Sequence, residues 1–208
     1  MFPIDRRAGK GAIVLLIAGI LSFLYIKLLA VLIFCVLGFH LAFFRDPVRT
    51  IPVGDYPVSP ADGKVVEISP VEEPQFLKGK AVKIGIFLSI FNAHVNRAPE
   101  AGRIAYLQYK PGKFLNVLDK KSVNLNESNW IGIEGARRVL VRQISGAIAR
   151  RIFWDVRLED QVRRGDKVGI ICYGSRTECF LPAENFQVAV KLGDLVKAGE
   201  TVLGVWTS

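Results

Sequence analysis

Three side chains that could act together in nucleophilic chemistry are widely separated in the 208-residue sequence: Ser175, His94 and Asp62. A serine hydroxyl is a weak nucleophile until a neighbouring base accepts its proton, and a carboxylate can orient that base. His94 is one of two histidines, and the other, His40, lies in an apolar run near the N-terminus. The alternative interpretation is a structural histidine with a serine and an aspartate that only form turns.

Other kinds of site find little support in the sequence. The G-x-S-x-G motif of a hydrolase nucleophile elbow does not occur. Cys172 and Cys179 are too far apart for a C-x-x-C motif, so we expect no metal site, and the cysteine pattern favours a reducing cytoplasm. The net charge of +9 is dispersed rather than gathered among aromatic residues, so we expect no nucleic-acid partner.

The apolar residues behind the mean hydropathy of +0.30 are concentrated near the N-terminus. Residues 12–26 and 28–44 form two apolar runs that only Lys27 separates. One helix over both runs would extend about 50 Å, well beyond a hydrocarbon core of about 30 Å. We therefore predict an α-helical membrane hairpin within residues 1–44, with one long tilted helix as the alternative. Basic residues on both flanks of a hairpin would place residues 45–208 on the cytoplasmic side of the cell membrane.

From residue 45 onward the sequence predicts a mainly β domain. Short apolar or alternating runs bounded by Pro and Gly are typical of strands, and they occur at 64–69, 82–90, 103–109, 138–149, 168–173, 186–191 and 201–206. Short helices are expected at 111–118 and 158–161. The Gly-Asp pairs at 165–166 and 193–194 resemble turns of biotinyl and lipoyl domains, so we expect a barrel-sandwich fold, single or duplicated.

Five motifs spread over nearly the whole chain carry a family resemblance. In sequence order they are FFRDP at 43–47, PADG at 60–63, FNAHVNRAP at 91–99, YKPGKF at 109–114 and GSR at 174–176. Together they resemble the short form of the phosphatidylserine decarboxylase proenzyme family, which includes the archaetidylserine decarboxylases. The long form of that family has Leu-Gly-Ser-Thr at the cleavage point and a second histidine where this chain has Arg97.

The resemblance implies a pyruvoyl-dependent carboxy-lyase that makes its own cofactor. Ser175 would attack the carbonyl of Gly174, and the chain would split into a large chain, 1–174, and a small chain, 175–208, that stay together as a heterodimer. The pyruvoyl group made from Ser175 would form a Schiff base with phosphatidylserine, or archaetidylserine, in the bilayer. Loss of CO2 would then give phosphatidylethanolamine, a step of phospholipid biosynthesis.

The resemblance also implies roles for the neighbouring residues. His94 and Asp62 would be the catalytic partners of Ser175, in cleavage, in decarboxylation or in both. Arg97 and Lys113 would bind the lipid phosphate or the departing carboxylate, with a solvated surface role as the alternative for each. Two other classes of protein stay open, namely a membrane-anchored, non-catalytic adaptor with a biotinyl-like domain and a serine hydrolase. A higher homo-oligomer also stays open.

Overall fold

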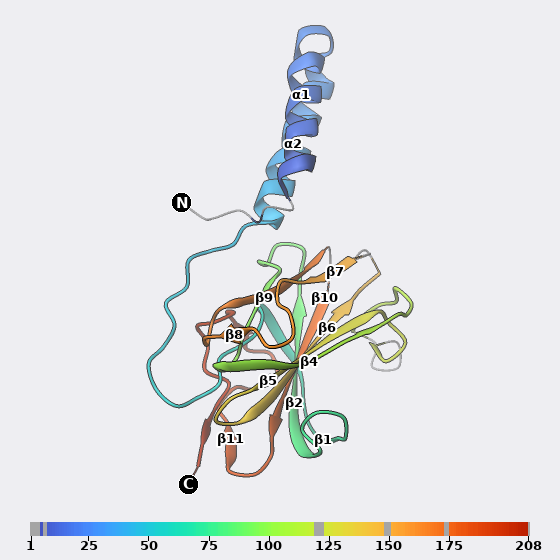
Figure 1. Ribbon diagram of the computed structural model, residues 1–208. Coiled ribbons are helices and arrows are strands. Elements are labelled where there is room, and N and C mark those ends of the chain that lie inside the picture. The colour runs from blue at the N-terminus through green and yellow to red at the C-terminus, as the bar shows by residue number, and fades with distance from the viewer. Residues whose placement is uncertain (1–4, 6–7, 119–122, 148–150, 173–174, 208) are drawn as a thin grey trace. The chain divides into compact units, whose positions relative to one another are not determined.

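The computed structural model describes residues 5, 8–118, 123–147, 151–172 and 175–207, and the chain divides into two compact units, Met1–Val48 and Arg49–Ser208. In the first unit, helices α1 (Gly9–Tyr25) and α2 (Lys27–Phe43) pack side by side (Figure 1), with extended backbone at Ile26 between them. Many of their large apolar side chains are exposed. No helix among the described residues is both long enough and apolar enough to cross a membrane.

The second unit is built from short strands, which confirms the prediction of a mainly β domain. The strands are β1 (Gly63–Glu73), β2 (Gly79–Leu88), β3 (Val95–Arg97), β4 (Gly102–Lys110), β5 (Ser128–Glu134), β6 (Arg138–Ser145), β7 (Arg151–Trp154), β8 (Gln161–Val162), β9 (Lys167–Cys172), β10 (Ser175–Pro182), β11 (Phe186–Val188), β12 (Leu195–Val196) and β13 (Gly204–Trp206).

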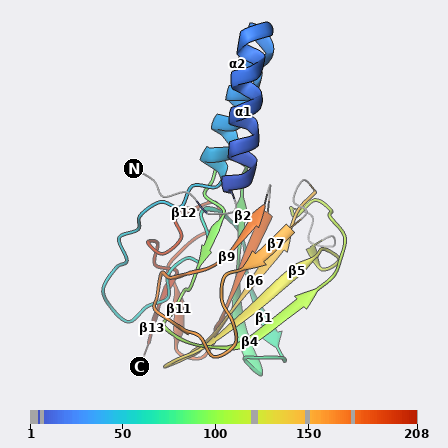
Figure 2. The same cartoon turned by 45° about the horizontal axis from the view of Figure 1, so that its top comes forward.

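The strands form a curled antiparallel sheet and two smaller sheets. The large sheet has the order β12-β1-β2-β10-β6-β5-β4-β8, and Figure 2 shows β6, β5 and β4 side by side within it. A second sheet has the order β3-β9-β7, and β11 pairs with β13. The main core lies on one face of the large sheet, where alternate residues such as Ile86, Val141 and Cys179 are buried. We call this the inner face, and the opposite face the outer face.

Each strand expected from the sequence overlaps an observed one, and the two short helices are wrong. The strands that were not expected are β3, β5, β7, β8, β10 and β12. At 111–118 the main chain bonds instead to a distant segment, since Lys113 N donates to the carbonyl of Leu125 at 2.7 Å. At 158–161 a tight turn precedes β8, with Glu159 at a φ of 75°. Both segments therefore follow tertiary contacts rather than local helical preference.

One type of turn recurs through the domain. Asp166 Oδ2 accepts a hydrogen bond from the main-chain N–H of Arg163 at 2.8 Å, and Gly165, at a φ of 85°, lies in the left-handed region that favours glycine. The turn at 191–194 has the same hydrogen bond and a glycine at the same position, and the turn at 157–160 has the same hydrogen bond. The Gly-Asp pairs are therefore tight turns that precede short strands, as expected.

Candidate active site

Ser175 is the first residue of the central strand of the large sheet. It pairs with Leu88 of β2 on one side of β10 and with Ser145 of β6 on the other. Its side chain is fully buried, and its Oγ has no hydrogen-bond partner among the residues that the structure describes. Ser175 therefore lies at a strand terminus. Gly174, the other half of the expected cleavage site, lies outside the described residues.

His94 lies directly before β3 and is fully buried. Its Nδ1 lies 3.0 Å from the carbonyl oxygen of Asn92. A carbonyl oxygen can only accept a hydrogen bond, so Nδ1 carries a proton and donates it to this carbonyl. The Oδ1 of Asn92 accepts hydrogen bonds from both N–H and Oγ of Ser89, at 2.8 and 2.7 Å, which fixes the loop. The loop thus fixes the orientation of the His94 ring.

The directions of β3 and β10, which belong to different sheets, bring His94 and Ser175 to the same end of the domain. Asn96 Nδ2 donates a hydrogen bond to Thr177 Oγ1 at 3.1 Å, and His94 and Ser175 each lie two residues before one of these partners. Residues two apart on a strand face the same side. Strand β3 runs antiparallel to β9, and β9 ends at Cys172, just before β10 begins. Both strands therefore start at the same end of the domain. His94 and Ser175 lie nearer to that end than the Asn96–Thr177 contact.

A buried polar network forms the layer beneath these two residues. Gln143 Nε2 donates to Asn96 Oδ1 at 2.8 Å, and Asn96 Nδ2 also donates to the carbonyl of Pro60 at 3.2 Å. Asn96, Gln143 and Thr177 are all fully buried. Because a buried amide costs free energy unless it is hydrogen-bonded, the network specifies one register for β3, β6 and β10. Asn96 lies inside the FNAHVNRAP motif, but its type and spacing alone indicated no role.

Asp62 is held by partners that the sequence did not indicate. Both of its carboxylate oxygens accept hydrogen bonds from Arg49, at 2.8 and 2.9 Å, and Oδ1 also accepts one from the main-chain N–H of Ala198 at 2.8 Å. The two charged side chains are largely buried. Asp62 therefore fixes the turn that contains Pro60, whose carbonyl also accepts a hydrogen bond from the N–H of Arg97 at 2.9 Å.

The two expected substrate-binding residues have different surroundings. Arg97 Nη1 donates to the carbonyl of Gly165 at 2.9 Å, so its guanidinium lies against the 163–166 turn. Lys113 has an exposed side chain, and its loop is fastened by Asn126. The Asn126 side chain bonds to the N–H and carbonyl of Leu115, at 2.9 and 2.8 Å, and to the carbonyl of Ser145 at 2.8 Å. The loop of Lys113 is therefore fixed to the end of β6, beside Ser175.

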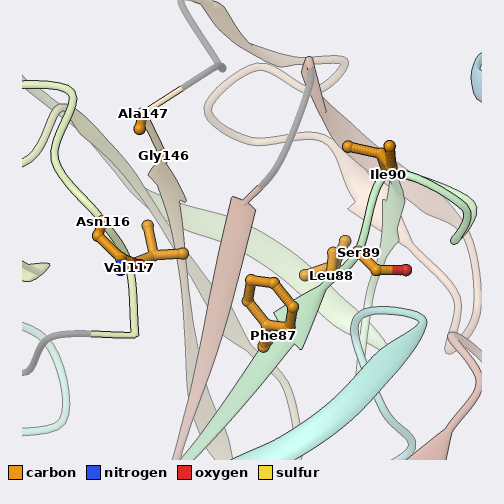
Figure 3. Close-up of a pocket in the computed structure, with 8 residues that line it drawn as sticks. All are labelled: Phe87, Leu88, Ser89, Ile90, Asn116, Val117, Gly146 and Ala147. Carbon is orange, nitrogen blue, oxygen red and sulfur yellow. The ribbon is translucent and has the colours of Figure 1, made fainter.

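An apolar pocket of about 290 Å³ opens at this end of β10 (Figure 3). It is lined by Phe87, Leu88, Ser89, Ile90, Asn116, Val117, Gly146 and Ala147. Leu88 is the β2 partner of Ser175, and Gly146 directly follows its β6 partner. Phe91 and Leu118, which directly follow the lining residues Ile90 and Val117, are 75% and 53% exposed. The lining therefore suits an apolar ligand, and it includes Leu88, a strand partner of Ser175.

The fold and site define a mainly β protein in which a buried serine begins a central strand, with a buried histidine and an apolar pocket at the same end of the domain. A family model described as phosphatidylserine decarboxylase matches residues 36–204. A protein of Symbiobacterium thermophilum named phosphatidylserine decarboxylase proenzyme is 45% identical over 208 residues, covering 97% of this chain and 95% of that protein. Proteins of the same name from Carboxydothermus hydrogenoformans and Geotalea uraniireducens are 47% and 41% identical, covering 85% and 95% of this chain and 84% and 95% of those proteins.

This chain belongs to the phosphatidylserine decarboxylase family, which confirms the resemblance seen in its motifs. The relatives are named as proenzymes of a decarboxylase, so the alternative of a non-catalytic adaptor is not supported. The comparisons name no residue roles, so the roles of Ser175, His94, Asp62, Arg97 and Lys113 stay predictions.

Proposed function

We propose that this chain decarboxylates phosphatidylserine to phosphatidylethanolamine with a pyruvoyl group made from its own Ser175. The family and the names of its relatives support the reaction. The observation that carries the cofactor is Ser175 itself, whose buried Oγ has no hydrogen-bond partner among the described residues. Burying a hydroxyl without a partner costs free energy, and the GSR motif at 174–176 distinguishes this buried serine as the reactive one.

Self-cleavage needs a base and a reachable carbonyl. His94 Nε2 would take the proton of Ser175 Oγ, which attacks the carbonyl carbon of Gly174 and converts the peptide bond into an ester. Loss of the Cα proton of residue 175 then expels the carboxylate of Gly174 and leaves a dehydroalanine. Water replaces the nitrogen of that residue, so ammonia is released and a pyruvoyl group remains on the small chain, 175–208.

The surroundings of position 175 fit this group. A pyruvoyl group has a ketone in place of the serine Cα–H and amine, and its carbonyl supplies the electron sink for decarboxylation of an amine substrate. The protein side chains around position 175 would therefore position the substrate, while the pyruvoyl carbonyl would accept the electrons. The pocket would hold the apolar part of the lipid next to position 175, and His94 would deliver a proton to the carbon that loses CO2.

Asp62 and the two cations have supporting roles in the proposal. Asp62 was expected to orient His94. Its contacts with Arg49 and Ala198 support an indirect path instead, because the Pro60 carbonyl of its turn binds Asn96. Lys113 is the better candidate for the lipid phosphate, since its side chain is exposed on the loop that lines the pocket. Arg97 would act by holding the 163–166 turn through its bond to Gly165.

The proposal extends to the membrane and to the finer fold. The exposed apolar surfaces of α1 and α2 and a phospholipid substrate support attachment to the cell membrane, with the catalytic unit on the cytoplasmic side. The recurring turn at 157–160, 163–166 and 191–194 supports a barrel-sandwich arrangement of the domain.

The covalent state of the purified protein tests this function. Mass spectrometry under denaturing conditions should show two fragments, 1–174 and 175–208, in place of the intact 23.1 kDa chain. The small fragment should lack a free α-amine and should react with a hydrazide, as a ketone does. Release of CO2 from phosphatidylserine should accompany the cleaved form only. An intact chain that releases CO2 would contradict the pyruvoyl proposal.

Filling the pocket should weaken turnover without preventing cleavage. Ala147 is exposed and lines the pocket, so Ala147→Trp should place an indole in the space without disturbing the core. We expect kcat/KM for phosphatidylserine to fall by at least about tenfold, or ~1.4 kcal/mol. Ala101→Trp is the matched control, because Ala101 is exposed beside Gly102, at the other end of β4 from Lys110. Equal kcat/KM values for the two variants would show that the substrate does not bind in the pocket.

A further inference from the structure

Cleavage before Ser175, which rests on the proposed function, would turn the reactive residue into a chain end. Chain ends fray unless neighbouring contacts tie them down, whereas an electron sink must keep its geometry relative to the substrate. The three residues that follow, Arg176, Thr177 and Glu178, lie on β10 and would belong to the small chain. Each of them bonds to a residue that would belong to the large chain.

The outer face of β10 carries two of these contacts. Arg176 Nη2 pairs with Glu67 of β1, and it also lies 2.8 Å from Glu178 Oε1. The other carboxylate oxygen of Glu178 pairs with Arg142 of β6 at 3.3 Å. All four residues are buried. Strand β10 is therefore linked by ion pairs to β1, two strands away, and to β6, its direct neighbour.

Gly85 provides the space for this arrangement. On β2, Gly85 pairs with Glu67 on one side and with Glu178 on the other, so the two carboxylates lie in one row across the sheet. A Cβ atom at Gly85 would lie 2.5 Å from Arg176 Nη2. The guanidinium thus occupies the place of a side chain at position 85. Without it, two buried carboxylates would repel each other across the glycine.

The Glu67 carboxylate of this row is charged at neutral pH. Burial alone would raise the pKa of Glu67, but hydrogen bonds from Arg176 and Lys83 outweigh burial and lower that pKa to about 2. Lys83 Nζ lies 3.1 Å from Glu67 Oε1. Removing one member of a buried ion pair leaves its partner buried and uncompensated, which costs more than the intact pair contributes.

The inner face of β10 carries the third contact. Thr177 Oγ1 accepts the hydrogen bond from Asn96 Nδ2, and Asn96 is the residue that links β3, β6 and the Pro60 turn. Successive residues of β10 are therefore fixed on alternate faces, as strand geometry requires.

We propose that Arg176, Thr177 and Glu178 form a clamp that holds the new end of the small chain against the large chain after cleavage. Arg176 is its principal positioning residue, because it neighbours position 175 and joins the two carboxylates. The clamp keeps the group at position 175 over the His94 layer once the peptide bond to residue 174 is gone. It also explains why a charged segment forms the central strand of the sheet.

The experiment compares the cleaved wild-type protein with three variants and one control, each made from the whole chain. Arg176→Gln removes the charge, Arg176→Lys keeps it, and Gly85→Ala displaces the guanidinium without removing any charge. Arg103→Gln is the matched control, because Arg103 pairs with Glu134 and Glu159 within the large chain. Mass spectrometry measures cleavage. Size-exclusion chromatography at increasing urea concentrations measures retention of the small chain. The values of kcat and KM are measured per cleaved chain.

We expect Arg176→Gln to be cleaved but to release its small chain at lower urea, with the dissociation constant of the two chains raised on the order of 100-fold. Its kcat should fall more than its KM changes. The Gly85→Ala protein should also release its small chain at lower urea and have a lower kcat. Arg176→Lys should recover part of the lost retention and kcat, and Arg103→Gln should resemble the wild type in both. Retention and kcat equal to wild type in both Arg176→Gln and Gly85→Ala would overturn the clamp alone. If Arg176→Gln does not fold, Gly85→Ala and Arg176→Lys decide. An uncleaved wild type would overturn both the proposed function and the clamp.

Discussion

Replacing Ser175 with alanine should leave the chain at full length and abolish decarboxylation. Alanine has no oxygen to attack the carbonyl of residue 174, so neither the ester nor the pyruvoyl group can form. We expect activity to fall by at least about 10⁴-fold, to background. Denaturing mass spectrometry and CO2 release measure the two results in one preparation.

Ser128→Ala is the matched control for this change. Ser128 is also fully buried, and its Oγ, like that of Ser175, has no hydrogen-bond partner among the described residues. It lies at the start of β5, two strands from β10. The Ser128→Ala protein should be cleaved and active. A cleaved, active Ser175→Ala protein would refute the assignment of the cofactor.

The second large effect is expected from His94→Ala. Loss of the base that accepts the Ser175 proton should slow cleavage by about 10²- to 10⁴-fold. The fraction that does become cleaved should also turn over slowly, because the same ring would protonate the substrate carbon. The time course of fragment appearance and the kcat per cleaved chain separate the two roles.

His40→Ala is the control for general loss of a histidine. His40 is the other histidine of the chain and lies on α2, in the unit that does not hold Ser175. The His40→Ala protein should be cleaved at the wild-type rate and show the wild-type kcat. If His94→Ala also behaves as the wild type in both measurements, His94 has neither role and its burial is structural.

The strands that position the site were only partly predictable. Apolar alternation marks β2 and β6, because their core residues face one side. Strand β10 carries Arg176 and Glu178 at consecutive outer positions, which is a pattern of a solvated loop. It becomes a central strand because Glu67 and Arg142, on other strands, neutralise those charges.

The residues around the site show the same limit. The motif order pointed to Ser175 and His94, but nothing in the sequence indicated that Asp62 would be bound by Arg49, which lies 13 residues earlier. No role was predicted for Asn96, because an asparagine two residues after a histidine does not indicate any particular chemistry. Its importance depends on Thr177 and Gln143, which are distant in sequence and meet it only across the sheets.

The sequence by itself determined the family, the mainly β character of residues 45–208 and the identity of the candidate serine and histidine, because motifs and periodicity are local properties of the chain. The tertiary structure decided that Ser175 begins a central strand and that Arg176 lies between two carboxylates over Gly85. The physical reason is that burial, register and charge compensation depend on which strands pair. Pairing between β1, β2, β10 and β6 joins residues up to 109 positions apart.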